Sequence, residues 1–281
     1  MAENSKIEWT HHTANLWWGC TKVHEGCDNC YALSASKRIG KDVWGNDKPR
    51  ALVGSVWSKL DSFQKKAREA GEIHRVFVGS MMDIFENPMP VVDWKGNLQN
   101  FTTGQLRDRF FKNITDGMYP NLMFLLLTKR PSNINRYIPE SWKSNPPENV
   151  MFGTSPVNQK TALTLIEQLL KVNGNRFLSV EPQLSEISLM PWLQSKQISW
   201  VIQGGESGHH KRYFDLEWGR KLKLECESQG IAYFFKQIDK KRQIPDDLMR
   251  REYPEKVFNC VLSHSLCSQV IQDNITNNNQ L

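Results

Sequence analysis

The sequence predicts an α/β fold, a full or partial (β/α) barrel of about six to seven parallel strands. Short apolar runs recur along the 281 residues, and each ends in polar residues that begin a loop. Helix-like stretches such as 161–172 and 216–229 lie between these runs. Alternation of strands and helices is typical of a parallel sheet, and continuous apolar runs are typical of strands buried on both faces. The chain is long enough to form one such domain.

The elements are expected in the following order. Residues 7–18 are rich in aromatic and β-branched side chains, and we expect a first strand there that ends near Gly19. A loop and a helix over 30–38 follow it, residues 40–58 are expected to be irregular, and residues 58–67 to be helical. The other strands are expected at 75–78, 123–127, 149–153, 176–180, 200–203 and 232–235.

The domain organisation is expected to be simple. Residues 1–239 would form the barrel domain, and residues 240–281 a C-terminal extension whose Asn-rich end is disordered. Cys226 lies in a predicted helix and is expected to belong to the core. Cys260 and Cys267 repeat a C-x6-C spacing, but without a close third ligand we expect buried or free thiols.

Three cysteines cluster early in the chain. Cys20, Cys27 and Cys30 lie within eleven residues in the spacing C-x6-C-x2-C. The start of the chain carries no apolar signal region, so we expect a cytoplasmic protein with reduced thiols, and a tight group of reduced cysteines indicates a metal site. An iron–sulfur cluster can bind three cysteines and leave one iron open. Zinc would need a fourth ligand, such as His24 or the upstream His11 or His12, and an absence of metal is the third alternative.

The carboxyl ends of the predicted strands carry polar residues. In a parallel barrel these ends meet at one face, where the active site lies, so we expect them to share a pocket. Carboxylates there could hold a cofactor or substrate, or form ion pairs with Lys129, Arg130 or Lys236, and Thr154 and Ser155 could bind an anion or cap the next helix. The candidate cofactor-binding residues are Ser80, Asp83, Thr128, Lys129, Thr154, Ser155, Glu181, Gly204, Gly205 and Glu206.

The charge balance permits a nucleic-acid partner without requiring one. The chain has 36 Lys and Arg residues against 30 Asp and Glu residues. Trp17, Trp18 and Trp44 flank the cysteines and could stack on a base, and the basic segment 209–212 could meet a phosphate. No apolar run approaches the ~18 residues that span a bilayer. We therefore expect a nucleic-acid or nucleotide partner and no membrane.

A set of short motifs then resembles a known group of proteins. The chain from Ile7 to Gln237 is similar to an uncharacterised three-cysteine family of phage and mobile-element proteins, which resembles the radical S-adenosylmethionine superfamily. The superfamily's common cysteine spacing is C-x3-C-x2-C, so the first loop is longer here. The matching segments are 7–10, 19–23, 26–32, 77–83, 128–131, 153–155, 179–182, 204–208 and 234–237.

The resemblance implies a specific chemistry. Cys20, Cys27 and Cys30 would hold three irons of a [4Fe-4S] cluster, and S-adenosylmethionine would chelate the fourth. An electron, supplied by a donor such as a flavodoxin, would cleave the cofactor to a 5′-deoxyadenosyl radical that takes a hydrogen atom from the substrate. The superfamily's Gly-Gly-Glu segment follows the second strand, so its role falls to Gly79–Asp83 and not to Gly204–Glu206.

Two hypotheses about function follow. The first is a radical S-adenosylmethionine enzyme that modifies or repairs nucleic acid or nucleotides. The second is a zinc-stabilised nucleic-acid-binding or accessory protein without catalysis. They differ in metal and cofactor: iron with S-adenosylmethionine would exclude the second, and zinc with a fourth protein ligand would exclude the first.

Overall fold

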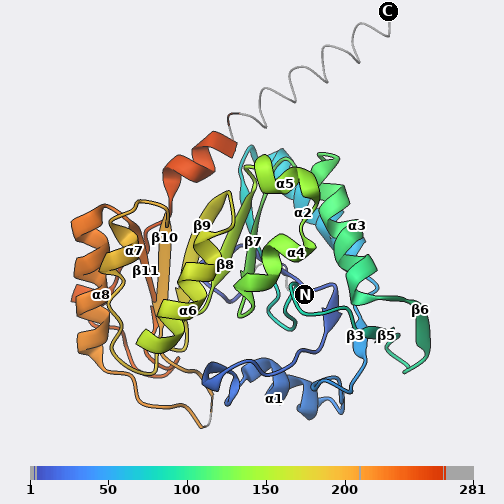
Figure 1. Cartoon of the computed structure of the whole chain (residues 1–281), viewed down its shortest axis with the longest axis horizontal. Coiled ribbons are helices and arrows are strands. Elements are labelled where there is room, and N and C mark those ends of the chain that lie inside the picture. The colour runs from blue at the N-terminus through green and yellow to red at the C-terminus, as the bar shows by residue number, and fades with distance from the viewer. Residues whose placement is uncertain (1–2, 4, 209, 262, 264–281) are drawn as a thin grey trace, which may run out of the picture.

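A seven-stranded parallel sheet forms the centre of the molecule (Figure 1). The computed structural model describes residues 3, 5–208, 210–261 and 263. Neighbouring strands pair in chain order, and the first and last strands are not paired with each other, so the sheet is a partial barrel. The predicted α/β class and its number of parallel strands are confirmed. The strands are β1 (His12–Ala14), β4 (His74–Val78), β7 (Leu122–Thr128), β8 (Val150–Thr154), β9 (Asn175–Val180), β10 (Trp200–Gly204) and β11 (Ala232–Gln237).

Helices cover the outer face of this sheet. In α2 the buried apolar residues Val56, Leu60, Phe63 and Ala67 recur at helical spacing and form one stripe. Figure 1 places α7 and α8 at one edge of the sheet, α2 and α3 at the other, and α1 across one end. The helices are α1 (Tyr31–Arg38), α2 (Val56–Ala70), α3 (Thr103–Thr115), α4 (Ile134–Tyr137), α5 (Glu140–Ser144), α6 (Gln159–Leu170), α7 (Met190–Leu193) and α8 (Leu216–Gln229), with 3-10 turns at Glu25–Cys27, Pro131–Asn133 and Asp246–Leu248.

A second, smaller sheet was not expected. It consists of β2 (Trp17–Trp18), β3 (Arg50–Leu52), β5 (Pro90–Val92) and β6 (Leu98–Thr102). The prediction of one first strand was therefore wrong, because β1 joins the large sheet and β2 the small one. The buried Asn15 separates them: its side chain bonds to the backbone N–H of Met81 and to the hydroxyl of Ser80, at 2.8 Å each. The prediction of an irregular segment over 40–58 was also wrong, since β3 and the start of α2 lie in it.

Two apolar layers stabilise the fold. The outer layer lies between sheet and helices and includes Val76 and Val78 of β4. The inner layer fills the concave side and includes Phe77 of the same strand, with Trp9 and Trp200. Successive strand residues point to opposite faces, so the apolar runs supply both layers. The buried Cys226 of α8 belongs to the outer layer, as predicted.

The segment after β11 packs against the barrel. Phe234 of β11 forms an isolated bridge with Arg251, and Tyr253 and Phe258 pack against the inner apolar layer. The division of the chain at residue 239 stays a prediction. Cys260 is exposed and its thiol lies 3.6 Å from a Glu148 carboxylate oxygen, whereas Cys267 and the Asn-rich end lie outside the described residues. In the part of the chain that the structure describes, no helix is long and apolar enough to cross a membrane.

Candidate active site

A pocket of about 260 Å³ lies where the parallel strands end. Residues that follow β4, β7, β9, β10 and β11 line it together with the cysteine loop, so the expectation of one shared pocket is met. Of the candidate residues, only Thr154 and Gly204 do not line it. Thr154 is buried and donates a hydrogen bond to the Thr128 carbonyl oxygen at 2.8 Å, and Gly204 pairs with Gln237 within the sheet.

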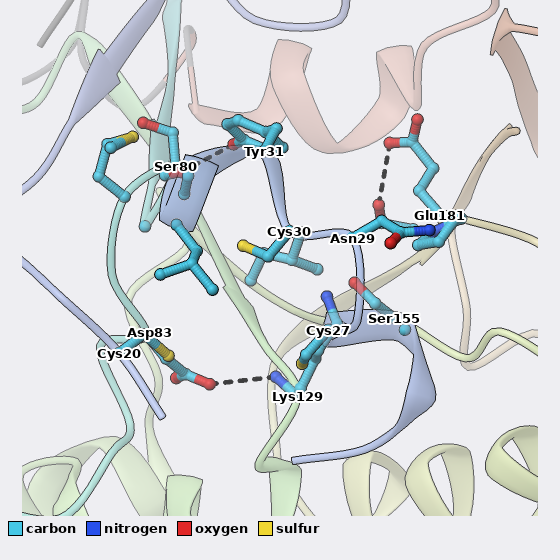
Figure 2. A pocket seen from close by; sticks show the side chains of 18 of the residues that line it. Cys20, Cys27, Asn29, Cys30, Tyr31, Ser80, Asp83, Lys129, Ser155 and Glu181 are labelled. Carbon is cyan, nitrogen blue, oxygen red and sulfur yellow. Dashed lines mark hydrogen bonds between the residues drawn. The ribbon is translucent and has the colours of Figure 1, made fainter. Parts of the chain in front are cut away.

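The loop between β2 and α1 presents all three cysteines to this pocket. Figure 2 shows Cys27 and Cys30 near its middle and Cys20 at its edge beside Asp83. The 3-10 turn Glu25–Cys27 shapes the loop, and Cys30 lies directly before the first residue of α1. All three side chains are half-buried. Three cysteines of one loop therefore line the same pocket.

Cys20 has a distinct environment. A guanidinium nitrogen of Arg130 lies 3.7 Å from its sulfur, and the same side chain donates to the Thr21 carbonyl oxygen at 2.7 Å. Burial raises the pKa of Cys20 to about 12, and the carboxylates of Asp83 and Glu86 add to the rise while Arg130 opposes it. The thiolate is the form that binds a metal, so metal binding at Cys20 would have to displace a firmly held proton.

Asp83 connects three parts of the pocket wall. One carboxylate oxygen accepts hydrogen bonds from the Thr128 hydroxyl at 2.7 Å and the Phe85 backbone N–H at 3.0 Å. The other accepts from the Lys129 backbone N–H at 3.2 Å, seen in Figure 2, and forms an ion pair with Arg130 at 2.8 Å. The ion-pair alternative for this carboxylate is the one observed. Both oxygens are engaged, so Asp83 positions the pocket wall through its neighbours.

Glu206 ties the loop after β10 to the cysteine loop. Its carboxylate accepts hydrogen bonds from the Asn29 amide at 2.9 Å and pairs with Arg212, whose Nη2 lies at 2.6 Å. Arg212 also donates to the Glu25 carbonyl oxygen at 3.1 Å. Burial raises the pKa of Glu206, but the bonds from Arg212 and Asn29 lower it more, so it lies below its ordinary value. An ion-pair partner was expected among Lys129, Arg130 and Lys236, and the observed partner is Arg212.

Removal of this tie should loosen the cysteine loop. We expect Glu206→Ala to speed backbone amide exchange in residues 25–31 by about tenfold, because charge-assisted hydrogen bonds that hold a loop contribute about 1.5–3 kcal/mol. Hydrogen exchange with mass spectrometry would measure this. Glu217→Ala removes an exposed carboxylate paired with Arg220 and serves as the control. Equal exchange in both variants would contradict a role of Glu206 in holding the loop.

Glu181 lies across the pocket from Asp83 (Figure 2) and pairs with Lys236. The Lys236 ammonium lies 2.9 Å from one carboxylate oxygen, and the Ser179 hydroxyl donates to the other at 3.2 Å. The space over the two glycines is filled by protein: a Cβ on Gly204 would lie 2.8 Å from a Glu181 oxygen, and one on Gly205 2.1 Å from the Ile238 carbonyl oxygen. These glycines therefore allow close packing of the chain on itself.

The remaining polar candidates contact other protein groups or have no capping role. The Ser80 carbonyl oxygen accepts a hydrogen bond from the Tyr31 hydroxyl at 2.7 Å (Figure 2). Neither Thr154 nor Ser155 caps a helix, since Asn158 caps α6. In the basic segment 209–212, Lys211 pairs with Asp239 at 2.7 Å and Arg212 with Glu206, while residue 209 lies outside the described part.

The histidines do not complete a zinc site with the cysteines. His11 and His12 do not line the pocket and contact Arg75 and His74 instead. His24 Nδ1 accepts a hydrogen bond from the Gly26 backbone N–H at 3.1 Å, and its buried Nε2 has no hydrogen-bond partner among the described residues. In residues 3–263, apart from the masked positions, no group of three or more His, Cys, Asp or Glu side chains is gathered to hold a metal ion. The assignment of the cysteines as metal ligands stays a prediction.

Several pocket residues were missed by the sequence reasoning. Asn29 and Tyr31 flank Cys30 and were considered only as part of the loop. Arg212, which binds Glu206 without lining the pocket itself, was considered a possible phosphate contact. The turn residue Lys240 also lines the pocket. Their proximity to the cysteines along the chain was the available signal for Asn29 and Tyr31. Nothing in the sequence singles out Glu206, six residues before Arg212, as the partner of Arg212.

With this geometry in place, comparison with known proteins defines the family. The family described as "Protein of unknown function (DUF5131)" matches residues 4–259. The chain belongs to this family. The description of the DUF5131 family assigns no activity to its members. No curated protein matches the chain.

Two solved structures share the fold of this DUF5131 protein. A Cys-to-Ser mutant of spore photoproduct lyase aligns with a TM-score of 0.52 and 13% identity, over 83% of this chain and 78% of that chain. A Cys-to-Ala mutant with dinucleoside spore photoproduct aligns with a TM-score of 0.51 and 13% identity, over 83% and 78%. Spore photoproduct lyase is a radical S-adenosylmethionine enzyme, so the predicted fold class is confirmed. At this identity the likeness shows the fold alone.

Proposed function

We propose that this chain is a radical S-adenosylmethionine enzyme that acts on a nucleic acid or nucleotide. The observation that supports the proposal most is the position of the three cysteines. One loop presents Cys20, Cys27 and Cys30 to a single pocket at the carboxyl ends of a parallel partial barrel, and the barrel resembles that of a radical S-adenosylmethionine enzyme.

The donor set fits an iron–sulfur cluster better than a zinc ion. Three thiols line the pocket, and His11, His12 and Nδ1 of His24 have other partners. A [4Fe-4S] cluster accepts three cysteines and leaves one iron for an exchangeable ligand. When bound, the cluster and S-adenosylmethionine would supply the radical chemistry, with electrons from a donor such as a flavodoxin.

The chain's own residues would orient the cofactor and exclude water. Gly79 and Ser80 line the pocket beside Cys30 and Tyr31, and Lys129 and Ser155 add a cation and a hydroxyl at the ends of β7 and β8. These groups could hold the carboxylate and amino groups of an amino-acid moiety. The apolar wall of Met81, Met82 and Leu127 would keep solvent away from reactive species.

A nucleic-acid or nucleotide substrate is supported by two observations. The structurally similar lyase was solved with a dinucleoside spore photoproduct. In this chain, Trp44 and the exposed Tyr31 line the pocket, and aromatic side chains can stack on a base. The phage and mobile-element setting suggested by the motifs would agree with modification or repair of nucleic acid.

The deciding experiment is anaerobic purification followed by reconstitution with iron and sulfide. We expect a brown protein with about four irons that releases 5′-deoxyadenosine when S-adenosylmethionine and a strong reductant are added. A colourless protein that binds one zinc ion would refute the proposal.

A further inference from the structure

The charges along one wall of the pocket are paired except at Lys240. Glu181 pairs with Lys236 at 2.9 Å, and the second Glu181 oxygen accepts the Ser179 hydroxyl. Behind this wall, Asp239 pairs with Lys211 at 2.7 Å and Glu8 with Arg251 at 2.9 Å. Lys240 lines the same wall and forms no ion pair with any residue that the structure describes. The wall therefore carries one positive charge that its own carboxylates do not balance.

A turn that is fixed by side-chain hydrogen bonds presents Lys240 to the pocket. Lys240 has a φ of 67°, a left-handed conformation that non-glycine residues rarely adopt. The buried Asp239 fixes the turn, because one of its carboxylate oxygens accepts the backbone N–H groups of Lys241 and Arg242 at 2.9 Å each. Backbone strain of this kind costs of order 1 kcal/mol and persists where the surrounding structure enforces it.

Lys240 lies at the rim of the pocket, and aromatic side chains lie deeper in it. Its side chain is exposed, whereas the lining also includes the half-buried Trp44 and the buried Trp9. A nucleotide has the same division, since its base is flat and weakly hydrated and its phosphate is charged and strongly hydrated. The base fits the aromatic interior, and the phosphate fits a cation at the rim.

We propose that Lys240 is a phosphate-binding residue of the substrate site, which takes a phosphodiester or nucleotide phosphate at the rim while the attached base enters the pocket. The inference takes its substrate class, a nucleic acid or nucleotide, from the proposed function. It adds the residue that recognises the phosphate. Glu181 does not oppose an anion here, because Lys236 and Ser179 engage its two oxygens.

The test compares a charged and a neutral ligand. Binding of a deoxydinucleotide with one phosphodiester, and of its uncharged methylphosphonate analogue, would be followed by tryptophan fluorescence in the iron-loaded protein with S-adenosylmethionine and without reductant. We expect Lys240→Ala to weaken binding of the phosphodiester roughly tenfold, as for loss of one charge-assisted contact, and to change binding of the analogue less than about twofold. Lys196→Ala is the matched control, since Lys196 also has a positive φ, 57°, and does not line the pocket.

Two outcomes would overturn the inference: equal losses for both ligands, and no loss for the phosphodiester. If the second outcome came with a loss of S-adenosylmethionine affinity, Lys240 would be assigned to the cofactor carboxylate. The proposed function is read separately, from iron content and 5′-deoxyadenosine release by the wild type. A wild type without iron would refute that function, and the two ligands would then be compared in the metal-free protein, where they still report on Lys240.

Discussion

Cys27→Ala is expected to abolish binding of the iron–sulfur cluster. Iron content should fall from about four atoms to nearly none after reconstitution, with loss of the brown colour, because a cluster held by two cysteines lacks the third anchor. Release of 5′-deoxyadenosine should then fall at least about a hundredfold, since this chemistry belongs to the cofactor. Iron and sulfide counting with a visible spectrum would measure the first effect, and chromatography of the products the second.

The chain offers a matched control for this substitution. Cys260 is an exposed thiol outside the pocket, so Cys260→Ala should retain the full iron content and colour. Cys27 is half-buried, and its loss leaves no buried polar atom without a partner, so the thermal unfolding midpoint of the metal-free protein should change little. If Cys27→Ala bound as much iron as Cys260→Ala, the cysteine loop would not be the metal site.

The pocket could be predicted from the sequence because its position follows from the geometry of a parallel sheet. Apolar runs such as 123–127 end in polar residues, and parallel strands bring those ends to one face. The structure accordingly places Asp83, Lys129 and Glu181 in one pocket, although the segments that contain them lie far apart along the chain.

The ion pairs of Asp83 with Arg130 and of Glu181 with Lys236 were among the alternatives that the sequence offered. The pair of Glu206 with Arg212 was not, because pairing depends on side-chain reach across the folded molecule. Glu206 follows Gly204 and Gly205 in the loop after β10, yet its carboxylate also accepts a hydrogen bond from Asn29, which precedes it by 177 residues. The small sheet was missed for a related reason. Its strands, such as the two-residue β2, are too short to show a periodic pattern, and long-range pairing alone defines them.

The largest effect on stability is expected at Arg50, which anchors the cysteine loop from the core. Its side chain is fully buried and pairs with Glu86 at 2.8 Å. It also donates to the carbonyl oxygens of Val43, Gly45 and Lys48 and to the Thr21 hydroxyl, which lies next to Cys20. We expect Arg50→Met to lower the free energy of unfolding by about 3–5 kcal/mol, because it leaves the buried Glu86 carboxylate without its cation.

The pH dependence of the unfolding free energy can show whether the loss comes from the unpaired Glu86 charge or from disrupted packing. Burial raises the pKa of Glu86 and Arg50 lowers it, so without Arg50 the carboxyl should hold its proton to higher pH. The ionised form is then disfavoured in the folded state alone, and the loss should be larger at pH 7 than near pH 5. The double variant Arg50→Met with Glu86→Leu should lose less than the single variant, since no unpaired charge remains.

Urea unfolding of these variants would measure both effects. Arg220→Met is the control, because Arg220 forms ion pairs with Glu217 and Asp247 at the surface, where such pairs contribute about 0–1 kcal/mol. A loss at Arg50 no greater than at Arg220 would contradict a stabilising role of the buried pair, and a loss independent of pH would contradict the unpaired Glu86 charge as its cause. If the expectation holds, the cysteine loop is fixed to the core before any metal binds, and metal binding would need to order only the thiols themselves.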